Sequence, residues 1–269
     1  MKVHRHAISP IRLMFAYRSR VLDGVGHDLR HRYVGSVLGI AWAVVAPLLQ
    51  LSIYATLYAL VFRIRPDGLG TEGYVLLVFS GLVPLLAFNE ALLAAMNSLS
   101  ANRALLLNTV FPAELIPLRA ALSVQVPGLV GLLVALGLSL WLGRVHWSAV
   151  IVVPALWVSL MMFATGIGWV LSLIVLVAKD LQHFIGLITM LLFICSPFAY
   201  TPDMVPAALR VAVWCNPLSY FVFCYQKVLC YGSSPEPVPF LGAMVIGIVA
   251  FFGGFAMFQR MKAVFFDYA

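Results

Sequence analysis

Charged side chains are scarce in this sequence. Of its 269 residues only 10% are Asp, Glu, Lys or Arg, whereas 63% are apolar. Soluble domains are about a quarter charged and about half apolar. So much apolar surface cannot be buried inside a water-soluble particle of this size. The composition therefore excludes an ordinary soluble domain and predicts an integral membrane protein.

Motifs of nucleotide hydrolysis and of metal or nucleophile catalysis are also missing. The sequence has no GxxxxGK[ST] phosphate loop, no GxSxG elbow and no HExxH pair. Its four cysteines form no CxxC pair and lie near no histidine cluster, so we expect no metal site. A disulfide among Cys215, Cys224 and Cys230 stays open, but small apolar packing residues are the favoured interpretation. We therefore predict no catalytic residue, no enzyme activity and no cofactor in this chain.

Six long apolar runs are present instead. A helix needs about 20 mostly apolar residues to cross the hydrocarbon core of a membrane. The runs that qualify are 37–62, 74–96, 120–142, 147–177, 184–200 and 240–258. They predict an all-α polytopic membrane protein with six transmembrane helices, organised as a single transmembrane domain over residues 1–269.

The distribution of positive charge predicts the orientation of the spans. With six spans both termini lie on one side, and that side carries twelve Lys and Arg residues against five on the other. Cytoplasmic loops carry the excess of Lys and Arg. We therefore expect both termini in the cytoplasm. The basic residues accompany no aromatic module or finger spacing, so nucleic acid is not an expected partner.

Residues 1–35 precede the first span and are basic. Within them, 8–29 places apolar residues at roughly helical spacing among arginines, a pattern typical of a helix in the membrane interface. The alternative is a solvated basic tail. The amphipathic spacing favours the interface helix, with membrane lipid as its partner.

The segment 201–239, before the last span, is neither a plain loop nor a plain span. It holds two apolar pieces, 204–214 and 218–229, and each is too short to cross a membrane. Such pieces are typical of interfacial or re-entrant helices, which protein or a wet cavity must shield. We expect an outer-face gate here, with Asp203, Asn216 and Pro217 as its polar and turn residues.

One carboxylate lies deep inside a predicted span. Glu90, beside Asn89, costs about 2.5–3.5 kcal/mol if it faces lipid at the centre of a helix, so it should face protein or water. Both residues are candidates for a channel or a subunit interface. The alternative is a protonated or hydrogen-bonded packing residue, and the sequence leaves the two interpretations equal.

Several ordered motifs resemble a known family. They are Arg32-Tyr33, Ser36-Val37-Leu38-Gly39, Trp42, Pro47, Ser80-Gly81 with Pro84, Phe111-Pro112 with Glu114 and Pro117, Asp180-Leu181, Ser196-Pro197 with Tyr200, Asn216-Pro217 and the terminal Phe266-Asp267-Tyr268-Ala269. In this order they are similar to the permease subunits of type 2 bacterial polysaccharide ABC exporters, which move O-antigen, group 2 capsule and teichoic acid chains. A departure follows Pro84, where Leu85, Leu86 and Ala87 replace the family's aromatic residues.

The resemblance implies partners and a location. It implies a homodimeric permease in the bacterial inner membrane, driven by two separate ATP-binding cassette subunits that bind ATP and Mg²⁺. The expected cargo is a lipid-linked polysaccharide of O-antigen or capsule type. The sequence chooses neither the polysaccharide nor its lipid.

The longest cytoplasmic connection, 97–119, is the expected contact with the ATPase. Pro112 and Pro117 interrupt helical structure, and Arg103 and Glu114 offer charged contacts. The alternative is an ordinary loop with family-typical prolines.

The basic entrance to the first span is where the substrate would enter the dimer. Arg30, Arg32 and Tyr33, with Trp42 just beyond, are placed to meet a phosphate-bearing head. Equally, the arginines are snorkelling anchors with no substrate role. The aromatic residues available to line a sugar path are Tyr54, Tyr58, Phe79, Phe88, Phe193 and Phe198.

Three alternative functions were weighed. An ABC exporter of a small lipid or drug shares the six-span design but lacks the RYxxSxLG opening. An ion-coupled secondary transporter would use Glu90 and predicts internal repeats, of which we find none convincing. A membrane polyprenyl-phosphate transferase needs clustered carboxylates for a metal, and only Asp23 and Asp28 lie close together.

Overall fold

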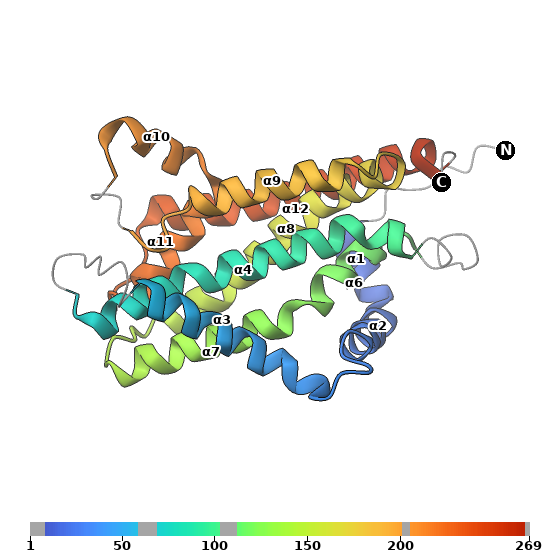
Figure 1. The fold of residues 1–269 in the computed structure, drawn as a ribbon. Coiled ribbons are helices and arrows are strands. Elements are labelled where there is room, and N and C mark those ends of the chain that lie inside the picture. The colour runs from blue at the N-terminus through green and yellow to red at the C-terminus, as the bar shows by residue number, and fades with distance from the viewer. Residues whose placement is uncertain (1–8, 59–68, 103–111, 201–204, 267–269) are drawn as a thin grey trace.

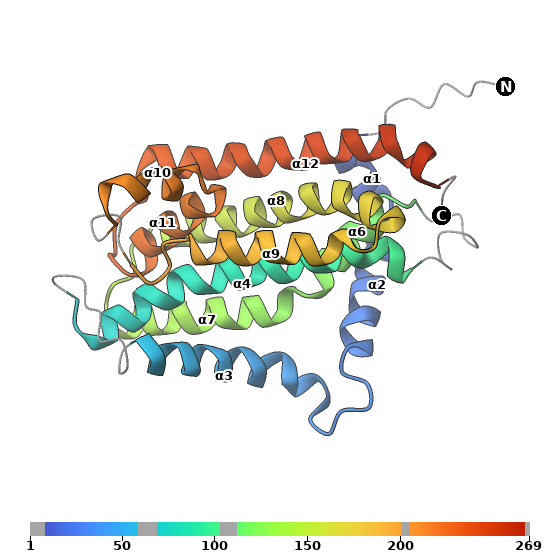
Figure 2. The same ribbon diagram turned by 45° about the horizontal axis from the view of Figure 1, so that its top comes forward.

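The computed structural model describes residues 9–58, 69–102, 112–200 and 205–266, and every regular element in these ranges is a helix. The helices are α1 (Pro10–Ala16), α2 (Arg18–His31), the short 3₁₀ helix η1 (Gly39–Ala41), α3 (Trp42–Thr56), α4 (Thr71–Ala101), α6 (Leu115–Ser123), α7 (Gln125–Trp141), α8 (Ala149–Val177), α9 (Leu181–Ile194), α10 (Ala207–Cys215), α11 (Pro217–Leu229) and α12 (Pro237–Phe266). The long helices run side by side in an elongated bundle (Figures 1 and 2). Because lipid offers the backbone no hydrogen bonds, helices are the element that an apolar chain of this kind must form.

Four of the described helical stretches are long and apolar enough to cross a membrane. They are Gly39–Thr56, Thr71–Ala101, Ala149–Val177 and Pro237–Lys262. A fifth arises if α6 and α7, which meet at a bend of 43°, count as one broken span. The prediction of an all-helical polytopic membrane protein is confirmed at this level, with four to five candidate spans. The end of the first predicted span lies partly outside the described residues.

Two prolines explain where the remaining predicted spans are interrupted. Pro127 cannot donate to the carbonyl of Ser123, and the chain bends at Val124 between α6 and α7. The predicted span 184–200 is a helix of only 14 residues, α9, which ends at Ile194. Pro197 follows, and the residue before a proline is disfavoured in helical conformation. Apolar length alone therefore overstated the helical part of this span.

Helix α4 forms the middle of the core. It packs against α6, α7, α8 and α11, and most of its side chains are buried. By contrast, α3 lies on the outside of the bundle, where only 11% of its apolar window is buried. The bundle thus leaves the apolar outer face of α3 available to lipid or to another chain.

The two ends of the bundle differ. Helices α1 and α2 lie across one end, where α12 also ends, and α10 and α11 lie at the opposite end (Figures 1 and 2). We name the first of these the basic end, because Arg12, Arg18, Arg20, Arg30 and Arg32 belong to α1, α2 and the residue that follows. The amphipathic segment predicted over 8–29 is therefore two short helices, separated at Tyr17.

The four cysteines are free thiols, and Cys224 and Cys230 are buried. Burial raises the pKa of the Cys230 thiol to about 11, although the nearby Arg144 guanidinium lowers it. A thiol with such a pKa is almost fully protonated near neutral pH and therefore unreactive. The packing interpretation holds for Cys224 and Cys230 but not for the exposed Cys215, and the open possibility of a disulfide is not realised.

Candidate functional site

The start of α6 is tied to two distant helices by Glu114, the residue that precedes it. The indole Nε1–H of Trp169 in α8 donates a hydrogen bond of 2.6 Å to the main-chain carbonyl of Glu114. The Glu114 carboxylate, in a residue only 6% exposed, pairs with the Lys262 ammonium near the end of α12. The Trp169 ring packs in a tilted arrangement against Phe251 and edge-on against Phe255, both of α12. One residue thus joins α6, α8 and α12.

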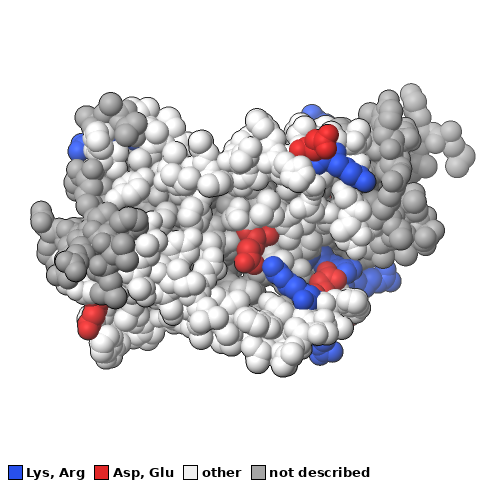
Figure 3. Space-filling view, viewed as in Figure 1, with Lys and Arg blue, Asp and Glu red and all other residues white. Residues whose placement is uncertain are grey.

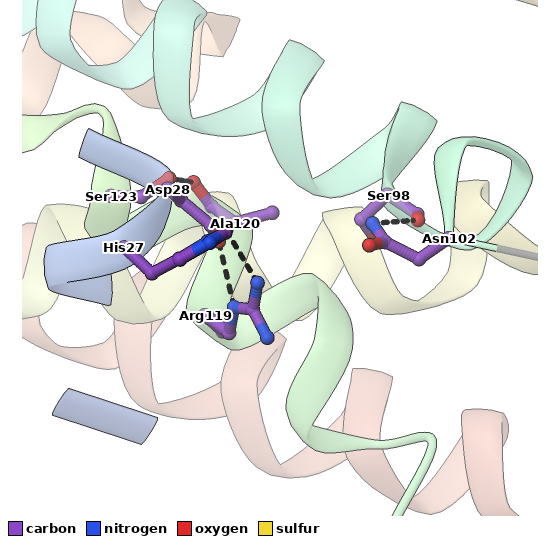
Figure 4. Close-up of polar contacts among 7 residues, drawn as sticks. All are labelled: His27, Asp28, Ser98, Asn102, Arg119, Ala120 and Ser123. Atoms are coloured by element: carbon purple, nitrogen blue, oxygen red, sulfur yellow. Dashed lines mark hydrogen bonds and ion pairs between the residues drawn. The ribbon is translucent and has the colours of Figure 1, made fainter. Parts of the chain in front are cut away.

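A second ion pair ties α6 to the helices at the basic end. The Arg119 guanidinium donates two hydrogen bonds to the Asp28 carboxylate in α2, and the Nε–Oδ2 distance is 2.7 Å (Figure 4). Apolar contacts support the pair, because Leu13 of α1 and Val21 of α2 share one buried cluster with α6, α8 and α12. We call Asp28, Glu114, Arg119, Trp169 and Lys262 the α6 junction. It makes α2, α6, α8 and α12 one connected unit.

Gly24 provides the space in which Arg119 crosses α2. A Cβ atom at Gly24 would lie 2.7 Å from Cδ and Nε of Arg119, whereas one at Gly26 would have nothing within 4 Å. Asp28 lies one helical turn beyond Gly24, on the same face of α2. The glycine and the aspartate together form a slot for the guanidinium.

Gly24→Leu is expected to displace Arg119 from Asp28 and to loosen α2 from α6. Loss of charge-assisted hydrogen bonds costs about 1.5–3 kcal/mol, so the apparent melting temperature of the purified chain should fall by about 5 °C. Gly26→Leu adds the same side chain to the same helix without a clash and is the matched control. Equal melting temperatures for the two variants would contradict the conclusion that Arg119 needs the space at Gly24 to reach Asp28.

Three of the four residues predicted to contact an ATPase, Pro112, Glu114 and Pro117, lie around this junction. Pro112 is half-buried just before α6, and Pro117 is buried in its first turn, where a proline is tolerated. Glu114 points inward to Lys262 rather than outward. Arg103 lies outside the described residues. The structure therefore gives Glu114 a partner within its own chain.

A narrow groove lies between α3, α4 and α7, and Glu90 lines it. Its other lining residues are Pro47, Gln50, Leu51, Val83, Leu86, Ala87, Pro127, Gly128 and Gly131. The Arg32 guanidinium approaches from the connection between α2 and α3, with Nη1 3.7 Å from Oε2 of Glu90. Figure 3 shows acidic and basic side chains facing each other in a hollow of an otherwise largely uncharged face. Arg32 and Glu90 were predicted as separate features, and the structure brings them together.

The other residues predicted at the substrate entrance stay apart from this pair. Arg30 at the end of α2 is exposed, Tyr33 is half-buried, and Trp42, 36% exposed, begins α3. Asn89, beside Glu90, is half-buried. These side chains border the connection between α2 and α3 but do not form a single described cluster.

At the opposite end, Asn216 links α9 to α11. Its side-chain amide donates to the Leu192 carbonyl and to Oγ of Ser196, both at 2.9 Å, and its Oδ1 accepts from the Leu218 amide. Pro217 then starts α11, where its missing N–H costs nothing. The predicted gate residues Asn216 and Pro217 thus cap α11 and hold it against the end of α9. Asp203 lies outside the described residues.

The aromatic residues that were predicted to be available for a sugar path fall into a buried group and a half-buried group. Phe79, Phe88 and Phe198 are buried in the main core, and Phe88 stacks on Phe163 of α8. Tyr54, Tyr58 and Phe193 are half-buried and pack at its margin. A surface for sugar rings is therefore open only to the second group in the isolated chain.

Sequence reasoning missed four residues of the α6 junction as functional candidates: Asp28, Arg119, Trp169 and Lys262. Lys262 pairs with Glu114, which lies 148 positions earlier in the sequence, and local sequence patterns do not predict contacts between such distant residues. Asp28 was weighed only as a metal ligand. The one available signal was Gly24 four residues before Asp28, since a glycine inside a helix often marks close packing.

Comparisons with known proteins complete the description. A family model described as ABC-2 type transporter matches residues 27–230. The chain is 28% identical over 242 residues to the O-antigen export system permease protein RfbA of Klebsiella pneumoniae, covering 87% of this chain and 89% of that protein. It is 24% identical over 261 residues to the protein of the same name from Myxococcus xanthus, covering 95% of this chain and 97% of that one.

Proposed function

Because the chain belongs to the ABC-2 type transporter family, we propose that it exports a lipid-linked polysaccharide of O-antigen or capsule type across the bacterial inner membrane. The chain is a membrane permease and not an enzyme. The observation that carries the substrate class is similarity to O-antigen export permeases along most of both chains.

The proposed topology has six spans: α3, α4, the bent pair α6–α7, α8, α9 and α12. Helix α9 covers about 21 Å at 1.5 Å per residue, so the residues that follow it, up to Tyr200, would complete the crossing. The basic end lies in the cytoplasm, as the excess of Lys and Arg on that side supports. Helices α10 and α11 then form a re-entrant gate at the outer face, held to α9 by Asn216.

The proposed assembly contains two copies of this chain and two separate ATP-binding cassette subunits, which bind ATP and Mg²⁺. The sequence has no phosphate loop, so the energy source must be a partner. The segment 97–119 is the proposed docking site for that partner, and it ends in the α6 junction. The junction suits such a role because a displacement of α6 would be passed to α2 through Asp28 and to α12 through Lys262.

The proposed route of the substrate head starts at the basic end. Arg30, Arg32, Tyr33 and Trp42 border the connection by which α2 leads into α3. A guanidinium binds phosphate in a bidentate manner, which suits the phosphate of a lipid-linked glycan. The polymer would then pass toward Asn216 and Pro217 at the outer end.

Deletion of the gene followed by analysis of surface glycans tests the function. We expect loss of the surface polysaccharide, accumulation of lipid-linked polymer inside the cell, and recovery on expression of the wild-type chain. Expression of Gly26→Leu, whose added Cβ atom would have nothing within 4 Å, should restore export equally.

An unchanged surface glycan with no internal polymer would overturn the proposal. A changed membrane lipid profile or a lost drug resistance under those conditions would instead support the alternative, an ABC exporter of a small lipid or drug. Ion-gradient dependence of uptake would support the secondary transporter that uses Glu90.

A further inference from the structure

The groove between α3, α4 and α7 contains a pair of opposite charges that do not satisfy each other. Arg32 Nη1 and Glu90 Oε2 are 3.7 Å apart, which is too far for a hydrogen bond. Oε2 of Glu90 is buried and has no hydrogen-bond partner. A buried carboxylate oxygen without a donor is costly, and such groups are normally satisfied. Among the described residues this oxygen therefore has an ion-pair partner in Arg32 but no hydrogen-bond donor.

The surroundings of the pair are largely apolar. Leu51, Val83 and Leu86 line the groove, with Gln50 as its second polar side chain. Beside it, α3 exposes Leu48, Leu49 and Ile53 on the surface of the bundle. A ligand for this place needs a polar head with both charges and an apolar part that lies along α3.

We propose that the groove binds the headgroup of a zwitterionic aminophospholipid, whose ammonium pairs with Glu90 and whose phosphate pairs with Arg32. A primary ammonium donates the hydrogen bond that Oε2 of Glu90 lacks, and a guanidinium is the preferred partner of a phosphate. The acyl chains lie over the exposed face of α3. This inference goes beyond the proposed function, since it concerns a resident lipid and not the cargo.

The missing donor at Glu90 selects among phospholipids. A primary ammonium carries N–H groups that can donate to the carboxylate. A trimethylammonium group has no N–H to donate. A headgroup without a cation would leave Glu90 unpaired beside a second negative charge. Phosphatidylethanolamine therefore fits better than phosphatidylcholine or phosphatidylglycerol.

Native mass spectrometry of the purified full-length chain tests this inference. The chain is mixed with equal amounts of the dioleoyl forms of phosphatidylethanolamine, phosphatidylcholine and phosphatidylglycerol, and retained lipid is counted per protein. We expect phosphatidylethanolamine to be retained about tenfold more than the other two, since one charge-assisted hydrogen bond is worth about that factor. Equal retention, or preference for phosphatidylglycerol, would overturn the proposal.

Two variants and a matched control locate the site. Glu90→Gln keeps the shape of the side chain and should remove the preference over phosphatidylglycerol, whereas Arg32→Gln, at an exposed position, should lower retention of every phosphate-bearing lipid. Glu72→Gln removes a carboxylate from an exposed position in the first turn of the same helix and should change nothing. A preference that survives both groove variants would place the lipid elsewhere and refute the proposal. Export of polysaccharide by the wild-type complex would stand in either case.

Discussion

Gly254→Ala is expected to prevent the chain from accumulating in the membrane, while Gly253→Ala has no effect. A Cβ atom at Gly254 would lie 2.0 Å from the main-chain oxygen of Gly166 in α8, and one at Gly253 would have nothing within 4 Å. Real Cβ contacts are essentially never closer than 3.0 Å. One methyl group must therefore force α8 and α12 apart.

The close approach of α8 and α12 makes this effect large. The same interface has two more such contacts, since Cβ atoms at Gly166 and Gly247 would lie 2.2 Å from the Ala250 oxygen and from Oγ of Ser159. Helices in lipid gain little from the hydrophobic effect and associate through close packing of small residues. Overpacking costs about 1–3 kcal/mol in a soluble core, and more where backbone atoms oppose each other.

Both variants, Gly253→Ala and Gly254→Ala, replace glycine by alanine inside the same helix, so a difference between them cannot come from helix propensity. Alanine is favoured over glycine inside a helix by about 1 kcal/mol, so Gly253→Ala should be neutral or slightly stabilising. The measurement is the amount of monodisperse protein extracted from membranes, with about tenfold less expected for Gly254→Ala. Similar yields for both variants would show that α8 and α12 do not meet at Gly254.

Long apolar runs were the most predictable part of the fold. The predicted spans 74–96 and 147–177 correspond to α4 and α8, and 240–258 to α12. The reason is physical: a crossing helix has a minimum length and tolerates few charges. The helices α4 and α12 are longer than predicted because a helix continues into the interface, where hydropathy falls but the backbone hydrogen bonds persist.

The contacts between helices were not predictable to the same degree. Hydropathy places Glu90 inside a span but does not say that Arg32 reaches it from another segment. Likewise, Arg119 entered the sequence argument only as a positive charge on the inner side, although it lies in the slot of Gly24 and Asp28. These pairings depend on how helices rotate and cross, and one sequence carries little information on either.

Two short motifs near the gate segment show an intermediate case. Ser196-Pro197 and Asn216-Pro217 were recognised as separate motifs, and Asn216 and Pro217 were expected as polar and turn residues of the gate. In the structure the Asn216 amide donates to Oγ of Ser196, so the two motifs contact each other. The turn chemistry was readable from the residues, whereas the contact followed from the packing of α11 against α9.

The pair of Glu114 and Lys262 gives the last and most specific prediction. Glu114→Lys and Lys262→Glu are each expected to lower transport-linked ATPase activity of the complete transporter by about tenfold, since each leaves two like charges together in a largely buried place. Leaving one member of a buried pair without its partner costs about 3–5 kcal/mol. Membrane insertion should be unaffected, because the spans are unchanged.

The exchanged double variant separates two roles for Glu114. If Glu114 holds α6 against α12, then Glu114→Lys with Lys262→Glu restores the opposite charges and should recover most of the activity. If Glu114 instead contacts the ATPase directly, a lysine at position 114 is wrong for the partner, and the double variant stays inactive. Because the Trp169 indole bonds the main-chain carbonyl at position 114, that link persists in every variant. Recovery in the double variant would therefore assign the effect to the carboxylate–ammonium pair itself.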